Sequence, residues 1–165
     1  MISQALSFIC AELRPHLGLE PHAIRPSSRP AVATGPRHAT ATLIAVRESP
    51  SLRQSQPPPP TRSEPAPATF PLLELDLLLS FGGSDYGESL DLLAKTIDFL
   101  HAHPIWSADT QLGTGAPPLP TSLDRITLHP VALSHEDQHH VWSALGAPYV
   151  PSVVYHVTLV PAGER

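Results

Sequence analysis

The number and placement of prolines restrict the fold of this chain more than any other feature of its sequence. The 165 residues include 21 prolines, most of them before Thr121. Because proline lacks a backbone N–H and breaks helices and central strands, much of the first two thirds of the chain is expected to form loops. We expect one domain over residues 1–165, with Pro-rich loops near 47–70 and 107–121.

Three segments between the prolines have the spacing of amphipathic helices. The first begins near Ile2 and is expected to stop at Pro15. The second spans residues 87–103 and the third residues 134–145, where Ser134 is expected to cap the helix start. The expected buried stripe of the second helix is Leu90, Leu93, Ala94, Ile97 and Leu100.

Four further segments have the pattern of β-strands, at residues 39–46, 72–81, 123–131 and 152–160. Leucine and polar residues alternate most clearly in 72–81, so the alternation predicts this strand despite leucine's modest strand propensity. Ile24 lies in a short stretch that suits an edge strand. The fold class is therefore predicted to be α+β, with a mostly antiparallel or mixed sheet of about four to five strands packed with three helices.

Charge and cysteine content exclude several classes of protein. The net charge is −5 and no basic run occurs, which disfavours binding to nucleic acid or to an anionic membrane. The one cysteine, Cys10, lies in the apolar pattern of the first helix, where core packing is the expected role. The first residues lack the basic region of a signal peptide, and no apolar run is long enough to span a bilayer.

One short motif suggests a metal site. His135, Glu136 and His139 match the H-E-x-x-H pattern of zinc hydrolases, in which two histidines hold the metal and the glutamate activates its water. Ser134 directly before the motif places these residues on the first, polar turn of a helix, whereas a catalytic zinc needs a rigid, dry surrounding. We therefore expect no metal, no cofactor and no catalytic residues, and keep the zinc hydrolase as a less favoured alternative.

Several segments resemble one known family. A Trp-Ser-Ala-Leu helix end at Trp142 is followed by Pro-Ser-x-x-Tyr, from Pro151 to Tyr155. The segments that carry the resemblance are 43–53, 70–82, 92–104, 133–145 and 149–155. They are similar to the amino-terminal domain of the cap, or tail-terminator, proteins of extracellular contractile injection systems, which are phage-tail-like particles.

The resemblance implies a structural role and no chemical reaction. It implies a homo-hexameric ring on the last ring of the inner tube protein, in contact with the outermost layer of sheath protein, which ends polymerisation. Assembly would take place in the cytoplasm, with no direct membrane contact. We expect the partner interface to include Leu52, Arg53, Val153, Tyr155 and Val157.

Two other structural roles stay open at this point. The chain would also suit another subunit of the same machine, at the baseplate or at the start of the tube. The four consecutive prolines at 57–60 would suit a monomeric adaptor that binds an aromatic groove.

Overall fold

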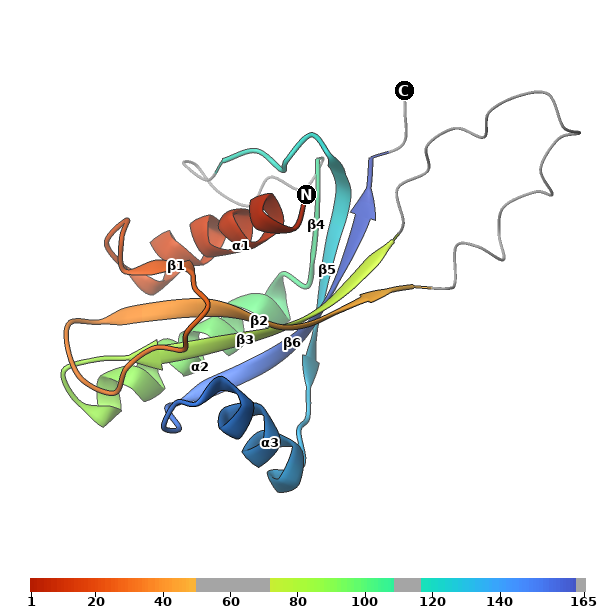
Figure 1. Cartoon of the computed structure of the whole chain (residues 1–165). Helices are drawn as coiled ribbons and strands as arrows, with labels where there is room; N and C mark the ends of the chain where they lie inside the picture. Colours follow the sequence, from red (N-terminus) through yellow and green to blue (C-terminus); the bar gives the residue numbers. More distant parts are fainter. Residues whose placement is uncertain (50–71, 109–116, 163–165) are drawn as a thin grey trace, which may run out of the picture.

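The computed structural model describes residues 1–49, 72–108 and 117–162 (Figure 1). Most of the two predicted Pro-rich loops, and residues Leu52 and Arg53, lie outside these ranges. The elements along the chain are α1 (Ile2–Leu17), β1 (Ile24–Pro26), β2 (His38–Glu48), β3 (Leu73–Gly82), α2 (Tyr86–Ala102), β4 (Ile105–Ser107), β5 (Leu123–Val131), α3 (His135–Leu145) and β6 (Ser152–Pro161).

The six strands of the described ranges form one sheet, in the order β1-β2-β3-β6-β5-β4. Neighbouring strands are antiparallel except β1 and β2, which are parallel, so the sheet is mixed. The predicted α+β class with three helices is confirmed. The described ranges contain six strands where about four to five were predicted: β1 includes Ile24, which was expected in an edge strand, whereas β4 has three residues and is too short to show alternation.

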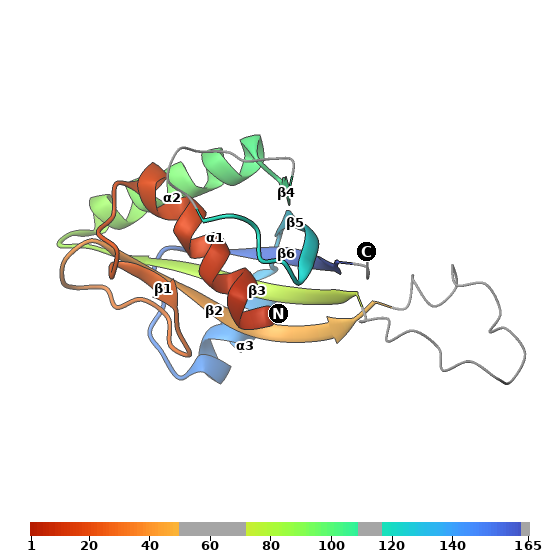
Figure 2. The ribbon, with the colours of Figure 1, turned by 90° about the horizontal axis from the view of Figure 1, so that it is seen from above.

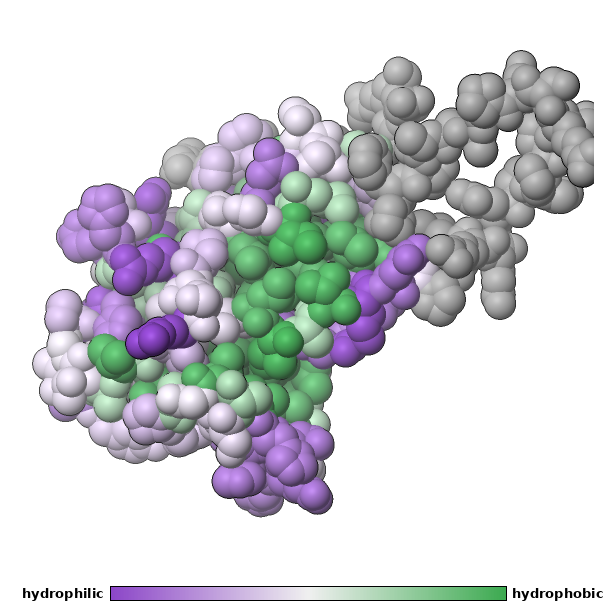
Figure 3. Space-filling view, viewed as in Figure 1, coloured by the Kyte–Doolittle hydropathy of each residue, from purple (hydrophilic) through white to green (hydrophobic). Residues whose placement is uncertain are grey.

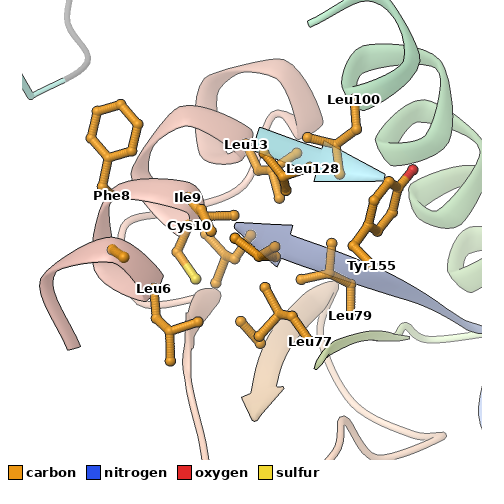
Figure 4. Close-up of a cluster of buried hydrophobic side chains, with 14 of the residues drawn as sticks. Leu6, Phe8, Ile9, Cys10, Leu13, Leu77, Leu79, Leu100, Leu128 and Tyr155 are labelled. Atoms are coloured by element: carbon orange, nitrogen blue, oxygen red, sulfur yellow. The ribbon is translucent and has the colours of Figure 1, made fainter. Parts of the chain in front are cut away.

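The helices of the described chain cover both faces of the sheet: α1 and α2 lie on one face and α3 on the other (Figure 2). The main core lies between the sheet and the first two helices. Alternate residues of β3 (Leu75, Leu77, Leu79 and Phe81) and of β6 (Tyr155, Val157 and Leu159) point into it. They meet Leu6, Ile9 and Leu13 of α1 and Leu100 of α2 (Figure 4). Each fully buried leucine contributes roughly 1.5–3 kcal/mol relative to an exposed one.

The predicted stop of the first helix at Pro15 is wrong by two residues. The helix continues to Leu17 and ends at Gly18, whose φ of 61° is the left-handed conformation that glycine adopts at low cost. Gly18 N–H donates to Pro15 O and Leu19 N–H to Arg14 O, both at 3.2 Å, which satisfies the last carbonyls of the helix. The glycine ends the helix, and Pro15 is accommodated in its last turn.

The predicted buried stripe of α2 is also wrong in part. The fully buried residues are Ser89, Leu92, Thr96 and Leu100, so two small polar side chains face the core. Thr96 is accommodated because its hydroxyl donates to Leu92 O at 2.8 Å. Leu90 and Ile97 are each 40% exposed. The helix therefore presents apolar residues to solvent beside its buried face.

The α3 face of the sheet has its own smaller core. Trp142 of α3 packs with Leu78 of β3 and Val154 of β6, and also with Ala31 and Val150. The start of α3 follows the predicted capping pattern: Asp137 N–H donates to Ser134 Oγ at 3.1 Å. In the described part of the chain, no helix is long and apolar enough to cross a membrane.

Candidate functional site

The predicted interface residues of β6 are largely enclosed within the monomer. Tyr155 is 2% exposed and Val157 0%, and both pack in the main core; Val153 is half-buried beside it. Their strand is paired on both sides, with β3 and with β5. A partner could not reach these two buried side chains in the folded domain. The interface expected at Leu52, Arg53, Val153, Tyr155 and Val157 stays a prediction, because Leu52 and Arg53 lie outside the described ranges. The geometry favours other surfaces for partner contact.

One such surface is the outer edge of β2. The short strand β1 pairs only with Ala39, Thr40 and Ala41, and in the described ranges no other strand pairs with this edge over residues 42–47. Along this edge Leu43 packs against the main core and Ile44 against the smaller core on the other face, the register of β2 shifts between Leu43 and Ala45, and Val46 is 46% exposed. Figure 3 shows a continuous apolar area on the face where β2 crosses the molecule, above the polar end of α3.

A second apolar surface runs along α2. Tyr86, Leu90 and Ile97 are 65%, 40% and 40% exposed, and Leu93 between them is half-buried. Their spacing of four, three and four residues aligns them on one side of the helix. We call these four residues the α2 surface. Leu90, Leu93 and Ile97 belong to the predicted buried stripe, because an apolar stripe on a helix usually faces the sheet, whereas Tyr86 lies before the predicted helix.

A charged cluster links the three central strands on the α3 side of the sheet. Arg47 Nη2 donates to both carboxylate oxygens of Asp76 at 2.7 Å, and His156 Nδ1 lies 3.0 Å from Asp76 Oδ1. Glu74 Oε2 lies 3.7 Å from His156 Nε2. Burial raises the pKa of Asp76, but the hydrogen bonds from His156 and Arg47 and their positive charge outweigh burial and lower the pKa overall. These contacts join β2, β3 and β6 through one carboxylate.

The H-E-x-x-H motif lies at the solvent-exposed start of α3. His135, Glu136 and His139 are all exposed, and the Oγ of Ser143 lies 3.4 Å from His139 Nε2. Among the described residues, no group of three or more His, Cys, Asp or Glu side chains is arranged to hold a metal ion. The motif therefore lacks the enclosed geometry that a catalytic zinc requires.

Buried titratable groups occur between α1 and the rest of the core. Burial raises the pKa of the Glu12 carboxyl, partly offset by the charge of His103. Burial also raises the pKa of the Cys10 thiol to about 12. A thiol with that pKa is not ionised near neutral pH and is a poor nucleophile, which fits its predicted role in core packing.

Comparison with known proteins identifies the family. The family model of the Pvc16 N-terminal domain matches residues 8–165. No curated protein matches the chain. Two solved structures share the fold. One is the PVC sheath/tube terminator of an extracellular contractile injection system in its extended state, with 15% identity and a TM-score of 0.59; the match covers 99% of this chain and 57% of that chain.

The other is the cap of the anti-feeding prophage, a tube-terminating cap, with 14% identity and a TM-score of 0.51. That match covers 93% of this chain and 52% of the solved one, so the chain spans little more than half the length of either structure. At such low identities the two structures show a shared fold, which is consistent with the family match over most of the chain. The chain belongs to the Pvc16 N-terminal domain family.

Proposed function

We propose that this chain is a structural cap that terminates the tube of a contractile injection particle. The observation that carries the proposal is the family match over residues 8–165, joined to a fold shared with two tube terminators. The exposed H-E-x-x-H motif and the structural role of the Arg47–Asp76 pair favour a role without a chemical reaction.

The proposed cap is a ring of six copies seated on the last ring of the inner tube and in contact with the outermost sheath layer. A closed ring suits the end of a tube because it meets every subunit of the last layer and leaves no subunit to recruit another. The tube layer presents a repeating surface, and the cap covers this surface without repeating it. Termination then needs only shape and surface complementarity.

The proposal includes the compartment and the partners. The particle assembles in the cytoplasm of the producing cell, and the cap's partners are the tube protein, the sheath protein and further copies of itself. The net charge of −5 gives no basis for direct contact with nucleic acid or an anionic membrane.

The test is the position of the chain in intact particles and the consequence of its loss. Particles from cells that produce an epitope-tagged chain are labelled with gold and imaged by electron microscopy. We expect label only at the end opposite the baseplate. Cells lacking the chain are expected to make tubes and sheaths of uncontrolled length, and the untagged chain supplied in trans should restore uniform length.

Other outcomes point to the other roles. Label at the baseplate end, or absence of all tubes without the chain, would assign it to the baseplate or to tube initiation. Uniform particle length without the chain would contradict the cap proposal. As a control, a chain with His135→Ala and His139→Ala should restore length fully; failure of this variant together with tightly bound zinc in the native protein would favour the hydrolase.

A further inference from the structure

We propose that Glu12 makes the packing of α1 depend on pH, so that the helix is held more firmly in mild acid than at neutral pH. Glu12 is 7% exposed and is the one acidic side chain among the buried residues of the described chain. The proposed cap function does not use this carboxyl. The inference concerns the domain itself and does not depend on a ring or a tube.

Glu12 lies in the seam where α1 meets α2 and β4. Residues four apart lie on one side of a helix, so Phe8, Glu12 and His16 share a side of α1. The Phe8 ring meets Trp106 of β4 edge to face, with ring centroids 5.7 Å apart. His16 stacks on Phe99 of α2, with ring centroids 4.6 Å apart. Glu12, between these two contacts, therefore faces an aromatic seam that solvates a charged carboxylate poorly.

The seam offers the carboxylate no hydrogen bond. Among the described residues, no N–H or O–H group donates to the Glu12 carboxylate. Trp106 Nε1 is buried in the same seam and has no hydrogen-bond partner either, so its N–H does not serve the carboxylate. A buried carboxylate without donors is costly in its ionised form, whereas the protonated form carries no charge. Burial accordingly raises the pKa of Glu12.

The charged groups around α1 offset the cost of burial only in part. The charge of His103, at the end of α2, lowers the pKa of Glu12, but burial has the larger effect. Glu88 of α2 is hydrogen-bonded to Ser84, and burial raises the pKa of Tyr155 of β6, so its hydroxyl stays neutral. Strand β4 has no titratable side chain. The other titratable residues of α2 and β1 are exposed: Arg25, Tyr86, Asp91, Lys95, Asp98 and His101.

The sign of the pH dependence follows from the direction of this shift. The pKa of Glu12 lies above its usual 4.5 in the folded chain, so folding favours the protonated carboxyl. Its contribution to stability is fully present below the usual pKa and is lost as the pH rises through the folded pKa. Asp76 acts in the opposite direction and below its own usual pKa of 3.8, so the two effects fall in different pH ranges.

The construction of α1 makes its packing sensitive to this charge. Met1, at the N-cap, makes no side-chain capping bond, and Pro15 lacks the N–H that would bond within the last turn. The helix therefore depends on the contacts of its buried side with α2 and the sheet. An ionised Glu12 in the middle of that side weakens these contacts, and its protonation restores them.

The slow reaction of Cys10 in the native full chain tests the inference, because this thiol is buried on α1 and reacts only when the helix opens (Figure 4). Its rate with an aromatic disulfide reagent is divided into the rate of the urea-unfolded chain at the same pH, which cancels the effect of thiol ionisation and gives a protection factor. At about pH 7.5, Glu12→Gln should raise this factor by about three- to tenfold over the native chain. The ratio should fall toward one at about pH 4.5, where the native carboxyl is largely protonated.

Two controls separate the proposed effect from general changes in stability. Glu20→Gln removes an exposed carboxyl just after α1 and should leave the protection factor unchanged at both pH values. Val154→Cys in a Cys10→Ala chain places the reporter in the smaller core on the other face, where Glu12→Gln should have no effect. A ratio that stays the same at both pH values would overturn the inference, because Glu12→Gln would then act through packing alone. An equal response at Val154→Cys would also overturn it, because the whole domain would then open in place of α1.

Discussion

His156 Nδ1 lies 3.0 Å from Asp76 Oδ1, and the two residues are direct neighbours across strands β6 and β3. A carboxylate only accepts hydrogen bonds, so Nδ1 of His156 carries the proton in this contact. Arg47 of β2 donates to both oxygens of the same carboxylate. Asp76 thus links three neighbouring strands beside the free edge of β2, on the side of the sheet that α3 leaves partly exposed.

The first prediction is that Asp76→Asn destabilises the domain by about 1 kcal/mol at neutral pH. The amount is small because Arg47 is 51% exposed and solvent screens the pair. The native pKa of Asp76 lies below its usual 3.8, so its stabilising contribution is present above that pH and is lost as the pH falls below it. Urea unfolding of both proteins at neutral and acidic pH measures this. The stability difference should shrink in acid, and equal stability at neutral pH would contradict the argument.

The second prediction uses two leucines of α2 that face different surroundings. Leu92 is 0% exposed and Leu90 is 40% exposed. We expect Leu92→Ala to lower the free energy of unfolding by about 2–5 kcal/mol, because it leaves a cavity in the core. Leu90→Ala should cost about 0.5 kcal/mol in the monomer. Denaturant unfolding of the purified chain compares them, and equal losses would show that the α2 surface is buried.

Most of the regular elements could be predicted from the sequence because their signals are local. The alternating leucines of β3 and the Ser134 cap of α3 each depend on a few neighbouring residues, and both are present in the structure. The end of α1 was less well predicted, because Pro15 is a strong local stop whereas the helix ends at Gly18, where the N–H groups of Gly18 and Leu19 bond back to Pro15 and Arg14.

The candidate surfaces could not be predicted because they depend on what each element packs against. Leu90 and Ile97 have the pattern of core residues, but the rotation of α2 is set by its contacts with α1 and β3. The three residues of β1 decide where the edge of β2 becomes free; Ile24 is predicted in an edge strand, but the sequence does not show which residues that strand pairs with. Tyr155 and Val157 are predicted interface residues and are buried in the monomer, because alternation alone cannot distinguish a core face from a contact face.

The third prediction concerns Val157, one of the predicted interface residues. Because Val157 is 0% exposed, Val157→Ala is expected to lower the stability of the isolated chain by about 2 kcal/mol. Any loss of ring formation should then follow the loss of folded protein. Thermal unfolding and light scattering of the same samples test this. A variant of native stability that fails to form rings would instead support the interface predicted at this residue.

The fourth prediction concerns Gly82 at the end of β3. A Cβ atom there would collide with the carbonyl oxygen of Val32 and the imidazole of His38, which lie in the loop between β1 and β2 and at the start of β2. The Val32 N–H donates to His38 Nε2 at 3.2 Å, so this loop cannot move freely. We expect Gly82→Ala to cost about 1–3 kcal/mol. The control is Gly87→Ala, in the first turn of α2, where the added Cβ would lie 3.1 Å from Asp85 Oδ1, so only one side chain must adjust and the cost should be smaller.

The fifth prediction is that Cys10 is chemically silent in the folded chain. Its thiol is buried and its pKa is raised to about 12, so at pH 8 it is neither accessible nor ionised. A thiol-specific chromogenic reagent should therefore detect no rapidly reacting thiol in the native protein and one per chain in urea. Ser143→Cys, which adds an exposed thiol on α3, should react at once in native conditions and provides the control. Rapid reaction of native Cys10 would mean that α1 opens from the sheet, because Ile9 and Leu13 on the same helix are also fully buried.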